Sequence, residues 1–237
     1  MNKQREAIIM KTMVVVGAGK LLGLSLAKKF GKNGYHVILI SRNPAKLALL
    51  QSELNKDNIQ SSYFTADMYD LNSLKTSFSE IYQKFGQVDI MEFSPNLGHQ
   101  NPINVKDLRP ENLASSLQGN LLAAIQSVQE VLPSMLRRKK GALLFTTGLS
   151  AIYPNPKMAD FSVAKAALRS YILNLDQSLK DKNIFVGHIS LGAFLKERTR
   201  KANDPDIVAD RWYQKYINNE HGEEVYPKGV TQATVIR

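Results

Sequence analysis

A glycine-rich segment near the start of the chain has residue types and spacing suited to binding a phosphate group. Gly17, Gly19 and Gly23 follow a short apolar run and precede a segment of helical period. Glycine permits a tight turn and a close approach of the backbone to a pyrophosphate, and a helix N-terminus offers unpaired N–H groups and a positive dipole end. We therefore expect a dinucleotide site that includes Lys20 and Leu22, with a purely structural turn as the alternative.

The end of the second predicted strand indicates which dinucleotide binds. A site for NAD(H) carries an acidic residue there to hold the ribose 2'-hydroxyl, and residues 36–43 contain no acid. Ser41 and Arg42 stand there instead, and the guanidinium of Arg42 suits a 2'-phosphate. Arg42 therefore favours NADP(H) over NAD(H), although an exposed basic side chain at the start of a helix is equally well interpreted as solvated.

The composition argues against several other classes of protein. The chain has no cysteine, and its four histidines show no paired metal-ligand spacing, so we expect neither thiol chemistry nor a metal site. No apolar run approaches the roughly 18 residues of a membrane helix, and residues 7–10 are too short for the core of a signal peptide. We expect a cytoplasmic protein that does not span a membrane.

The net charge of +10 is spread along the chain apart from one basic run at residues 137–140. We interpret this run as the last turn of a helix, where basic side chains favour the negative dipole end, with Gly141 as the stop signal. A patch that binds polyanions is the alternative interpretation. We do not expect a nucleic-acid partner.

The elements that position these residues follow from the alternation of short apolar runs with longer segments of helical period. This alternation is typical of βαβ units, so we expect an α/β protein with a Rossmann-type doubly wound parallel sheet of about seven strands and helices on both faces. In such a sheet the ligand lies at the carboxyl ends of the strands, where the strand order reverses. The predicted strands are 12–16, 36–40, 62–66, 88–92, 142–147, 184–190 and 223–226.

The length suits one domain of this kind, so we treat residues 1–237 as a single dinucleotide-binding domain. Residues 193–222 break the alternation with charged helical segments. Because long irregular connections are often functional, we expect a lid or substrate-side flap in this range.

The residues named so far resemble the short-chain dehydrogenase/reductase family, over about residues 12–192. The glycine loop of this family has the form Gly-x-x-x-Gly-x-Gly; Gly17 and Gly23 match its first and last glycines, and Leu21 replaces the middle one. Lys20 occupies a place where NADP(H)-using members of the family often carry a basic residue, so together with Arg42 the resemblance implies NADP(H). Asp67 matches the family's acid near the adenine, with a helix cap as the alternative. The family's Asn-Asn-Ala-Gly motif reads Phe-Ser-Pro-Asn at residues 93–96.

The resemblance also implies catalytic roles. Family members transfer hydride between a nicotinamide and a carbonyl or alcohol; a tyrosine acts as acid and base, a lysine tunes it and holds the ribose, a serine orients the substrate and an asparagine supports a proton relay. Lys165 and Asn120 match the lysine and the asparagine. Phe161 occupies the tyrosine position and Gly148 the serine position, so the usual proton donor is missing.

Tyr153 is a candidate substitute for that donor. Tyr153 and Lys157 have the spacing of a tyrosine–lysine pair, but the prolines between them forbid a regular helix, so we expect a loop. Three hydroxyls lie nearby, and we expect them to bond mostly to the backbone; they belong to Thr146, Thr147 and Ser150.

These residues lead to one principal hypothesis and two alternatives. The principal one is an NADP(H)-dependent oxidoreductase that acts on a small-molecule carbonyl or alcohol and takes its proton from Lys165, Tyr153 or the substrate. The first alternative is a catalytically inactive NADP(H)-binding sensor or protein-interaction module. In the second alternative Leu21 abolishes dinucleotide binding and the basic surface binds an acidic partner.

The resemblance further implies a homodimer or homotetramer. Members of the family associate through long helices, here expected at residues 110–138 and 159–180. The apolar residues Leu168, Ile172 and Leu175 on the second helix fit such an interface, and core packing explains them equally well.

Overall fold

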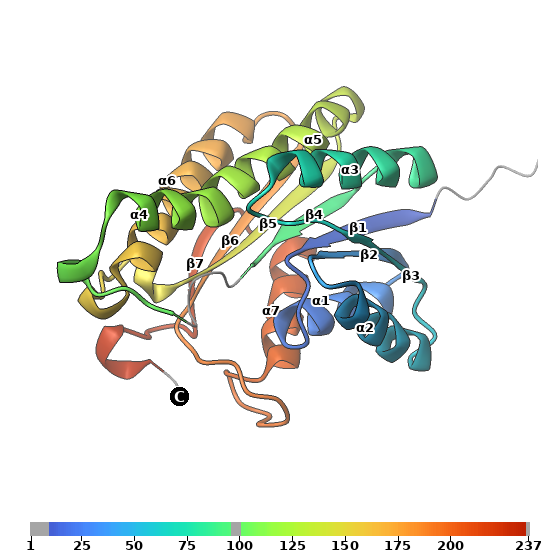
Figure 1. The fold of residues 1–237 in the computed structure, drawn as a ribbon. Coiled ribbons are helices and arrows are strands. Elements are labelled where there is room, and N and C mark those ends of the chain that lie inside the picture. Colours follow the sequence, from blue (N-terminus) through green and yellow to red (C-terminus); the bar gives the residue numbers. More distant parts are fainter. Residues whose placement is uncertain (1–9, 96–100, 236–237) are drawn as a thin grey trace, which may run out of the picture.

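The computed structural model describes residues 10–95 and 101–235, and its strands form one seven-stranded parallel sheet in the order β3-β2-β1-β4-β5-β6-β7 (Figure 1). This is the doubly wound Rossmann-type sheet expected from the sequence. Each predicted strand lies within two residues of an observed one. The strands are β1 (Lys11–Val16), β2 (Tyr35–Ser41), β3 (Ser61–Thr65), β4 (Ile90–Phe93), β5 (Gly141–Gly148), β6 (Ile184–Leu191) and β7 (Gly222–Tyr226).

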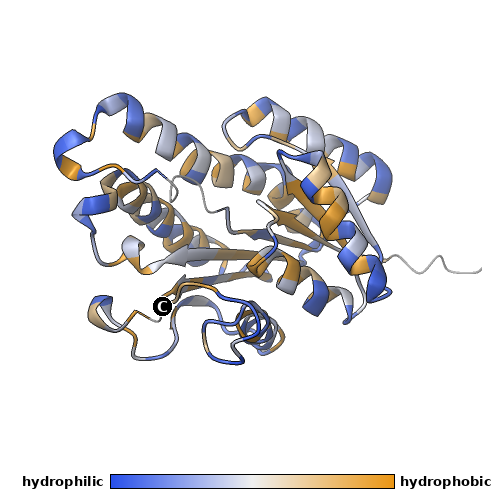
Figure 2. Ribbon diagram, turned by 60° about the horizontal axis from the view of Figure 1, so that its bottom comes forward, coloured by the Kyte–Doolittle hydropathy of each residue, from blue (hydrophilic) through white to orange (hydrophobic). Residues whose placement is uncertain are grey.

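Helices cover both faces of the sheet (Figures 1 and 2). One face carries α3 (Leu71–Phe85), α4 (Pro110–Leu117), α5 (Ala123–Arg138) and α6 (Ala159–Leu179). The opposite face carries α1 (Leu22–Gly31), α2 (Pro44–Lys56) and α7 (Pro205–Ile217). No helix in the described ranges is long and apolar enough to cross a membrane.

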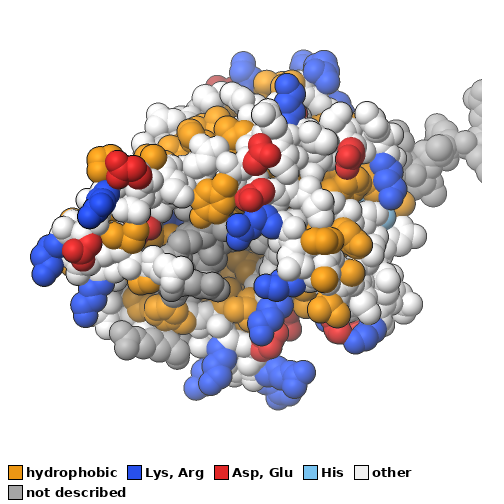
Figure 3. Space-filling view, viewed as in Figure 1, with side chains coloured by type: hydrophobic (Ala, Val, Ile, Leu, Met, Phe, Trp, Pro, Cys, Tyr) orange, Lys and Arg blue, Asp and Glu red, His pale blue; other side chains and the backbone are white. Residues whose placement is uncertain are grey.

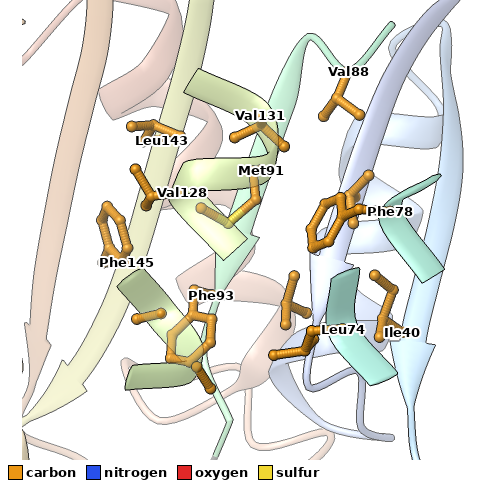
Figure 4. Packing of buried hydrophobic residues seen from close by; sticks show 14 of the residues in the cluster. Ile40, Leu74, Phe78, Val88, Met91, Phe93, Val128, Val131, Leu143 and Phe145 are labelled. Carbon is orange, nitrogen blue, oxygen red and sulfur yellow. The ribbon is translucent and has the colours of Figure 1, made fainter. Parts of the chain in front are cut away.

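Two apolar layers hold these helices to the sheet. On the side of α3, α5 and α6, the layer includes Phe78, Phe93 and Phe145, which Figure 4 shows among the other buried side chains of this layer. On the side of α1 and α7, Phe30 and Trp212 are fully buried. Strands buried on both faces read as continuous apolar runs, which is why they could be located from the sequence.

Leu168, Ile172 and Leu175 belong to the first of these layers. Their apolar character is therefore explained by packing against the sheet, which was one of the two interpretations given for them.

The long helix expected at residues 110–138 is interrupted by a π-helical turn at Gln118–Leu122. A π turn adds a residue to the helical repeat, and such turns are frequent at functional sites. Asn120 lies in this turn and is fully buried.

The basic run at residues 137–140 ends a helix as expected, but the stop residue is different. Lys139 takes the left-handed conformation at the end of α5, with φ +51°. Gly141 instead begins β5, where a Cβ atom would lie 2.4 Å from Met135 Cγ. Arg138 donates to Asp89 Oδ1 at 2.9 Å and to the Val88 carbonyl at 2.6 Å, so this arginine is partnered rather than simply solvated.

The range 193–222, expected as a flap, divides into two parts. Its second part is mainly α7, which packs against α1 and buries Trp212 completely. Its first part, residues 193–204, is a connection without helix or strand, and only this part remains a candidate lid.

Candidate functional site

A cavity of about 640 Å³ opens at the carboxyl ends of the strands. The strand order reverses between β1 and β4, and the loops that follow these two strands supply part of the wall. The end of β5 and the segment after β6 supply the remainder. Figure 3 shows the surface hollowed here, with hydrophobic side chains inside the hollow.

The glycine loop forms one side of the cavity. Gly17 has φ +84°, and the N–H groups of Gly17 and Ala18 both donate to the Ile40 carbonyl at 2.9 Å. A Cβ atom on Gly17 would lie 2.7 Å from Pro95 Cβ, so glycine permits the close approach of the loops after β1 and β4. A Cβ on Gly19 would meet nothing within 4 Å, which leaves open space beside this residue.

The N-terminus of α1 faces the same cavity. Leu21 is the N-cap, no side chain caps the helix, and its first turn contains no acidic residue. Leu21, Leu22 and Gly23 all line the cavity. The unpaired N–H groups of this first turn are therefore available to an anion.

Three predicted cofactor residues do not line the cavity; they lie at or just beyond the ends of β2 and β3. Arg42 Nε lies 3.9 Å from Asp67 Oδ1, and the Arg42 side chain is 58% exposed. Ser41 lies beside Thr65 in the sheet register. Asp67 Oδ1 accepts a hydrogen bond from the Tyr69 N–H at 3.0 Å.

The helix-cap alternative for Asp67 is wrong, because the N-cap of α3 is Asp70. The Asp67 carboxylate instead shapes the turn before the helix and pairs loosely with Arg42.

Lys165 is almost completely buried, with 2% of its surface exposed, and it contributes to the cavity wall. Its Nζ donates to the Pro95 carbonyl at 3.1 Å and lies 5.3 Å from the centroid of the Phe161 ring. Burial lowers the pKa of Lys165 to about 8, and the nearby Glu92 carboxyl opposes part of that effect.

Phe161 and Gly148 also line the cavity, and neither carries a hydroxyl. At Gly148 a Cβ would have Ser150 Oγ as its nearest neighbour, at 3.7 Å, so the site has room for a side chain. Ser150 and Tyr153 line the same cavity.

The expectation of a loop between Tyr153 and Lys157 agrees with the structure. Tyr153 lies in a bend, and Lys157 belongs to a short 3-10 helix, Pro156–Met158. Lys157 is exposed and does not line the cavity, so it cannot act with Tyr153 as a helical tyrosine–lysine pair.

Asn120 is fully buried and does not line the cavity. Its Nδ2 donates to the Ser116 carbonyl at 2.9 Å, while no donor in the described part of the chain reaches its Oδ1. Asn96, the last residue of the motif at 93–96, lies outside the described residues.

The strand hydroxyls near the cavity do not bond as expected, because their partners are side chains. Thr147 Oγ1 lies 2.8 Å from His188 Nε2 and 3.1 Å from Ser190 Oγ. Thr146 Oγ1 donates to Glu92 Oε1 at 3.4 Å and accepts from Trp212 Nε1 at 3.1 Å. The expectation assumed that these hydroxyls would bond to nearby backbone groups. In a regular strand the backbone N–H and C=O groups already bond to the neighbouring strands, so the hydroxyls bond to side chains instead.

Glu92 is the residue of this region that sequence reasoning missed. It lies in β4, is fully buried, and its burial raises its pKa to about 8. An acidic residue inside an otherwise apolar strand departs from the pattern of hydrophobic and polar residues expected there. This departure could have marked Glu92 in the sequence as a candidate functional residue. Within the described residues, no group of three or more His, Asp or Glu side chains could hold a metal ion.

Comparison with known proteins identifies the family. The profile of the family described as short chain dehydrogenase matches residues 11–206. This chain belongs to the short-chain dehydrogenase family. The glycine loop, Asn120 and Lys165 all lie inside the matched range.

Similar proteins include two reductases. A very-long-chain 3-oxoacyl-CoA reductase from Laccaria bicolor is 28% identical over 180 residues, which cover 75% of this chain and 53% of the relative. A fatty acyl-CoA reductase from Acinetobacter baylyi is 24% identical over 176 residues, covering 72% of this chain and 60% of the relative. The chain thus spans little more than half the length of these short-chain dehydrogenase relatives.

A solved structure of a metagenomic short-chain oxidoreductase in complex with NADP has the same fold. The TM-score is 0.81 at 18% identity, and the match covers 91% of this chain and 95% of the other.

Proposed function

We propose that this short-chain dehydrogenase is an NADP(H)-dependent oxidoreductase that transfers hydride to or from a carbonyl or alcohol, with Lys165 as the proton donor. The main support for this proposal is the position of the Lys165 amine, which is buried in the wall of a cavity at the point where the strand order reverses. Burial lowers its pKa to about 8, and a group whose pKa lies near the working pH is suited to acid–base catalysis.

The residues present fit a dinucleotide. Gly19 leaves open space in the loop, and the uncapped N-terminus of α1 suits a pyrophosphate. Lys20 and Arg42 are exposed and basic, which suits a 2'-phosphate, while Ser41, Asp67 and Lys165 complete the proposed contacts. When bound, NADP(H) supplies or accepts the hydride. The chain binds and orients the cofactor and the substrate, and it exchanges the proton with the substrate.

In this proposal Phe161 and Gly148 replace the tyrosine and serine that the family uses. Without a phenol the proton must come from another group, and Lys165 is the buried titratable side chain in the cavity wall. Tyr153 lines the same cavity and is the competing donor. Asn120 keeps the π turn in place through its bond to Ser116, and its unfilled Oδ1 is the acceptor through which it would support a proton relay.

We propose an apolar carbonyl compound as the substrate. Several side chains that line the cavity are apolar; they are Leu149, Met158, Phe161, Leu191, Leu195 and Val235. The names of the two relatives describe reductases of acyl-CoA compounds, which supports a carbonyl as the group that is reduced.

A second candidate function is a cofactor-binding module without turnover. It is favoured by the absence of a hydroxyl at both residues 161 and 148, which removes the family's proton donor and its orienting group together.

A measurement of turnover distinguishes the oxidoreductase from the binding module. Variants of Lys165 and Tyr153 then identify which side chain is the proton donor. Oxidation of NADPH is followed with aldehydes, ketones and quinones. We expect carbonyl-dependent oxidation that falls by a factor on the order of 10² or more in Lys165→Met, and much less in Tyr153→Phe. The reverse ranking would assign the proton to Tyr153, and tight NADPH binding without any turnover would favour the binding module.

A further inference from the structure

Four polar side chains form a largely buried cluster beneath α6, and the proposed cofactor site and proton donor give this cluster no task. They come from three neighbouring strands: Thr147 from β5, His188 and Ser190 from β6, and Glu223 from β7. The first three are at most 4% exposed. Burying polar side chains costs free energy unless they are hydrogen-bonded, and the adjoining layer under α6 is apolar. The cluster therefore departs from simple core packing.

Hydrogen bonds join these side chains into one continuous chain. Thr147 Oγ1 lies 3.1 Å from Ser190 Oγ, and Ser190 Oγ donates to Glu223 Oε1 at 2.7 Å. His188 Nε2 lies 2.8 Å from Thr147 Oγ1 and 3.5 Å from Ser190 Oγ, so the imidazole holds the two hydroxyls together. A hydroxyl both donates and accepts, so protons can pass along Thr147 and Ser190 without a change in the position of either side chain.

The two ends of this chain lie in different hollows of the molecule. Thr147 lines the cavity whose wall also contains Lys165. Glu223, whose side chain is 14% exposed, lines a second hollow together with Arg211 and Lys215. The two hollows share no lining residue among those that the structure describes. The chain of hydrogen bonds therefore connects the cavity with a separate part of the surface.

The charged groups around Glu223 keep its carboxyl ionised between proton transfers. Arg169 on α6 donates from Nε to both carboxylate oxygens, at 2.8 and 2.9 Å. Burial alone would raise the pKa of Glu223, but the hydrogen bonds from Arg169 and Ser190 outweigh burial and lower it. The pair of Arg169 and Glu223 is enough to hold β7 to α6, so the hydroxyls that continue to the cavity are not needed for that purpose.

We propose that Thr147, Ser190 and Glu223 form a proton path, held in place by His188, that exchanges protons between the cavity and the solvent at the second hollow. The proposal rests on the proposed function, because only a reaction that takes up or releases protons needs such a path. Lys165 is 2% exposed, and in the proposed reaction cofactor and substrate occupy the cavity that it lines. A separate path lets the amine regain its proton while the cavity stays occupied.

Each transfer along the path moves one proton. A hydronium ion or a buffer acid in the second hollow protonates the Glu223 carboxylate. Glu223 then passes a proton to Ser190 Oγ as Ser190 passes its own to Thr147 Oγ1, and Thr147 releases its proton into the cavity. Water or substrate in the cavity carries this proton to the Lys165 amine. Glu223 is again a carboxylate, both hydroxyls return by rotation, and oxidation of an alcohol uses the same path in reverse.

The first test interrupts the middle of the path with Ser190→Ala. Carbonyl-dependent NADPH oxidation is followed at constant pH and ionic strength, with low and high concentrations of imidazole, a small proton carrier that reaches the cavity directly from solvent. At low imidazole we expect the rate of the variant to be about tenfold below that of the wild type, and at high imidazole to approach it. The wild-type rate should not depend on imidazole.

Ser127→Ala is the matched control, because this buried serine donates to the Ala123 carbonyl within α5 and does not line the cavity. We expect the wild-type rate from it at both imidazole concentrations. A wild-type rate of Ser190→Ala at low imidazole would overturn the path. A lower rate that imidazole does not restore would also overturn it, because a purely structural role of Ser190 predicts that result.

The second test interrupts the outer end of the path with Glu223→Gln, which keeps the shape of the side chain but cannot take up the proton. We expect the same loss of about tenfold and the same restoration by imidazole. The double variant with Ser190→Ala should be no slower than the slower single variant, because both substitutions interrupt one path. Losses that multiply would overturn a single path. If one single variant does not fold, the other still tests the proposal with imidazole.

The outcomes distinguish the proton path from the proposed function. Wild-type NADPH oxidation that is lost in Lys165→Met, but is unaffected by Ser190→Ala and Glu223→Gln at low imidazole, would support the oxidoreductase and overturn the path. Tight NADPH binding without oxidation in the wild type would contradict the oxidoreductase itself, and the path with it, because no proton would be consumed.

Discussion

Phe161 lies one helical turn before Lys165 on α6, and the centroid of its ring is 5.3 Å from Lys165 Nζ. Both side chains line the cavity, and both are almost fully buried. The ring contributes to the burial that lowers the pKa of the amine, and it has no proton of its own to exchange. In the proposed reaction the acid–base chemistry of this wall therefore falls to Lys165.

Restoring a phenol at this place should increase turnover. In Phe161→Tyr the new hydroxyl stands one turn from the Lys165 ammonium, which favours the phenolate and makes the phenol a better acid. We expect the rate of carbonyl-dependent NADPH oxidation to rise by a factor of about 10². Phe194→Tyr, which adds a hydroxyl elsewhere on the cavity wall, is the control, and an equal gain in both variants would contradict the assignment.

The glycine loop offers a prediction about stability. Gly17→Ala places a Cβ 2.7 Å from Pro95 Cβ at φ +84°, whereas Gly19→Ala meets nothing within 4 Å. We expect Gly17→Ala to lower the free energy of unfolding by about 2 kcal/mol or more, and Gly19→Ala to change it little. Urea denaturation of the two variants measures this difference. Equal losses would show that the close approach of the two loops does not depend on glycine.

Arg42 should determine the choice of dinucleotide. Its exposed guanidinium lies 3.9 Å from Asp67 Oδ1 and 5.8 Å from the centroid of the Tyr69 ring, and these two loose contacts leave its N–H groups available to a 2'-phosphate. We expect Arg42→Ala to weaken NADPH binding about tenfold and to leave NADH binding nearly unchanged. Fluorescence titration measures both affinities, with the exposed Arg109→Ala as the control. Parallel weakening of both dinucleotides would contradict recognition of the 2'-phosphate.

Glu92 should make the stability of the protein depend on pH. Its pKa is raised from 4.5 to about 8 in the folded state, so between these values the folded protein binds more protons than the unfolded chain. Stability is therefore lost as the pH rises from about 4.5 to about 8, and this loss should largely disappear in Glu92→Gln. Urea denaturation of both proteins at several pH values measures the effect. The same pH dependence in Glu92→Gln would place its origin in another group.

The fold could be predicted because its signals are local and repeated. Apolar runs such as residues 12–16 and 142–147 mark strands buried on both faces, and the glycine loop between the first strand and the first helix sets the ligand edge of the sheet. One boundary residue differs from the prediction: Lys139, in the left-handed conformation, rather than Gly141 terminates α5. Gly141 has a different role, since at the start of β5 a Cβ atom would lie 2.4 Å from Met135 Cγ.

The site could be predicted only in part. Lys165, Tyr153 and the glycine loop do line one cavity, since their places follow from the family's motif register. The side-chain network near the cavity could not be predicted, because the hydrogen bond from Thr146 to Glu92 joins residues 54 positions apart and the one from Trp212 to Thr146 joins residues 66 positions apart. Residues 205–217 were wrongly assigned to a flap for a similar reason. Trp212 on α7 is buried by contacts of this helix with α1 and the sheet, and the local sequence pattern does not reveal such contacts.

The most direct test of the account is a titration of the purified wild-type protein with NADPH, followed in the same cuvette by a panel of carbonyl compounds. We predict saturable NADPH binding that is tighter than NADH binding, and oxidation of the bound NADPH only when a carbonyl is added. Failure to bind either dinucleotide would contradict the account, because the open space at Gly19 and the uncapped N-terminus of α1 would then have no ligand.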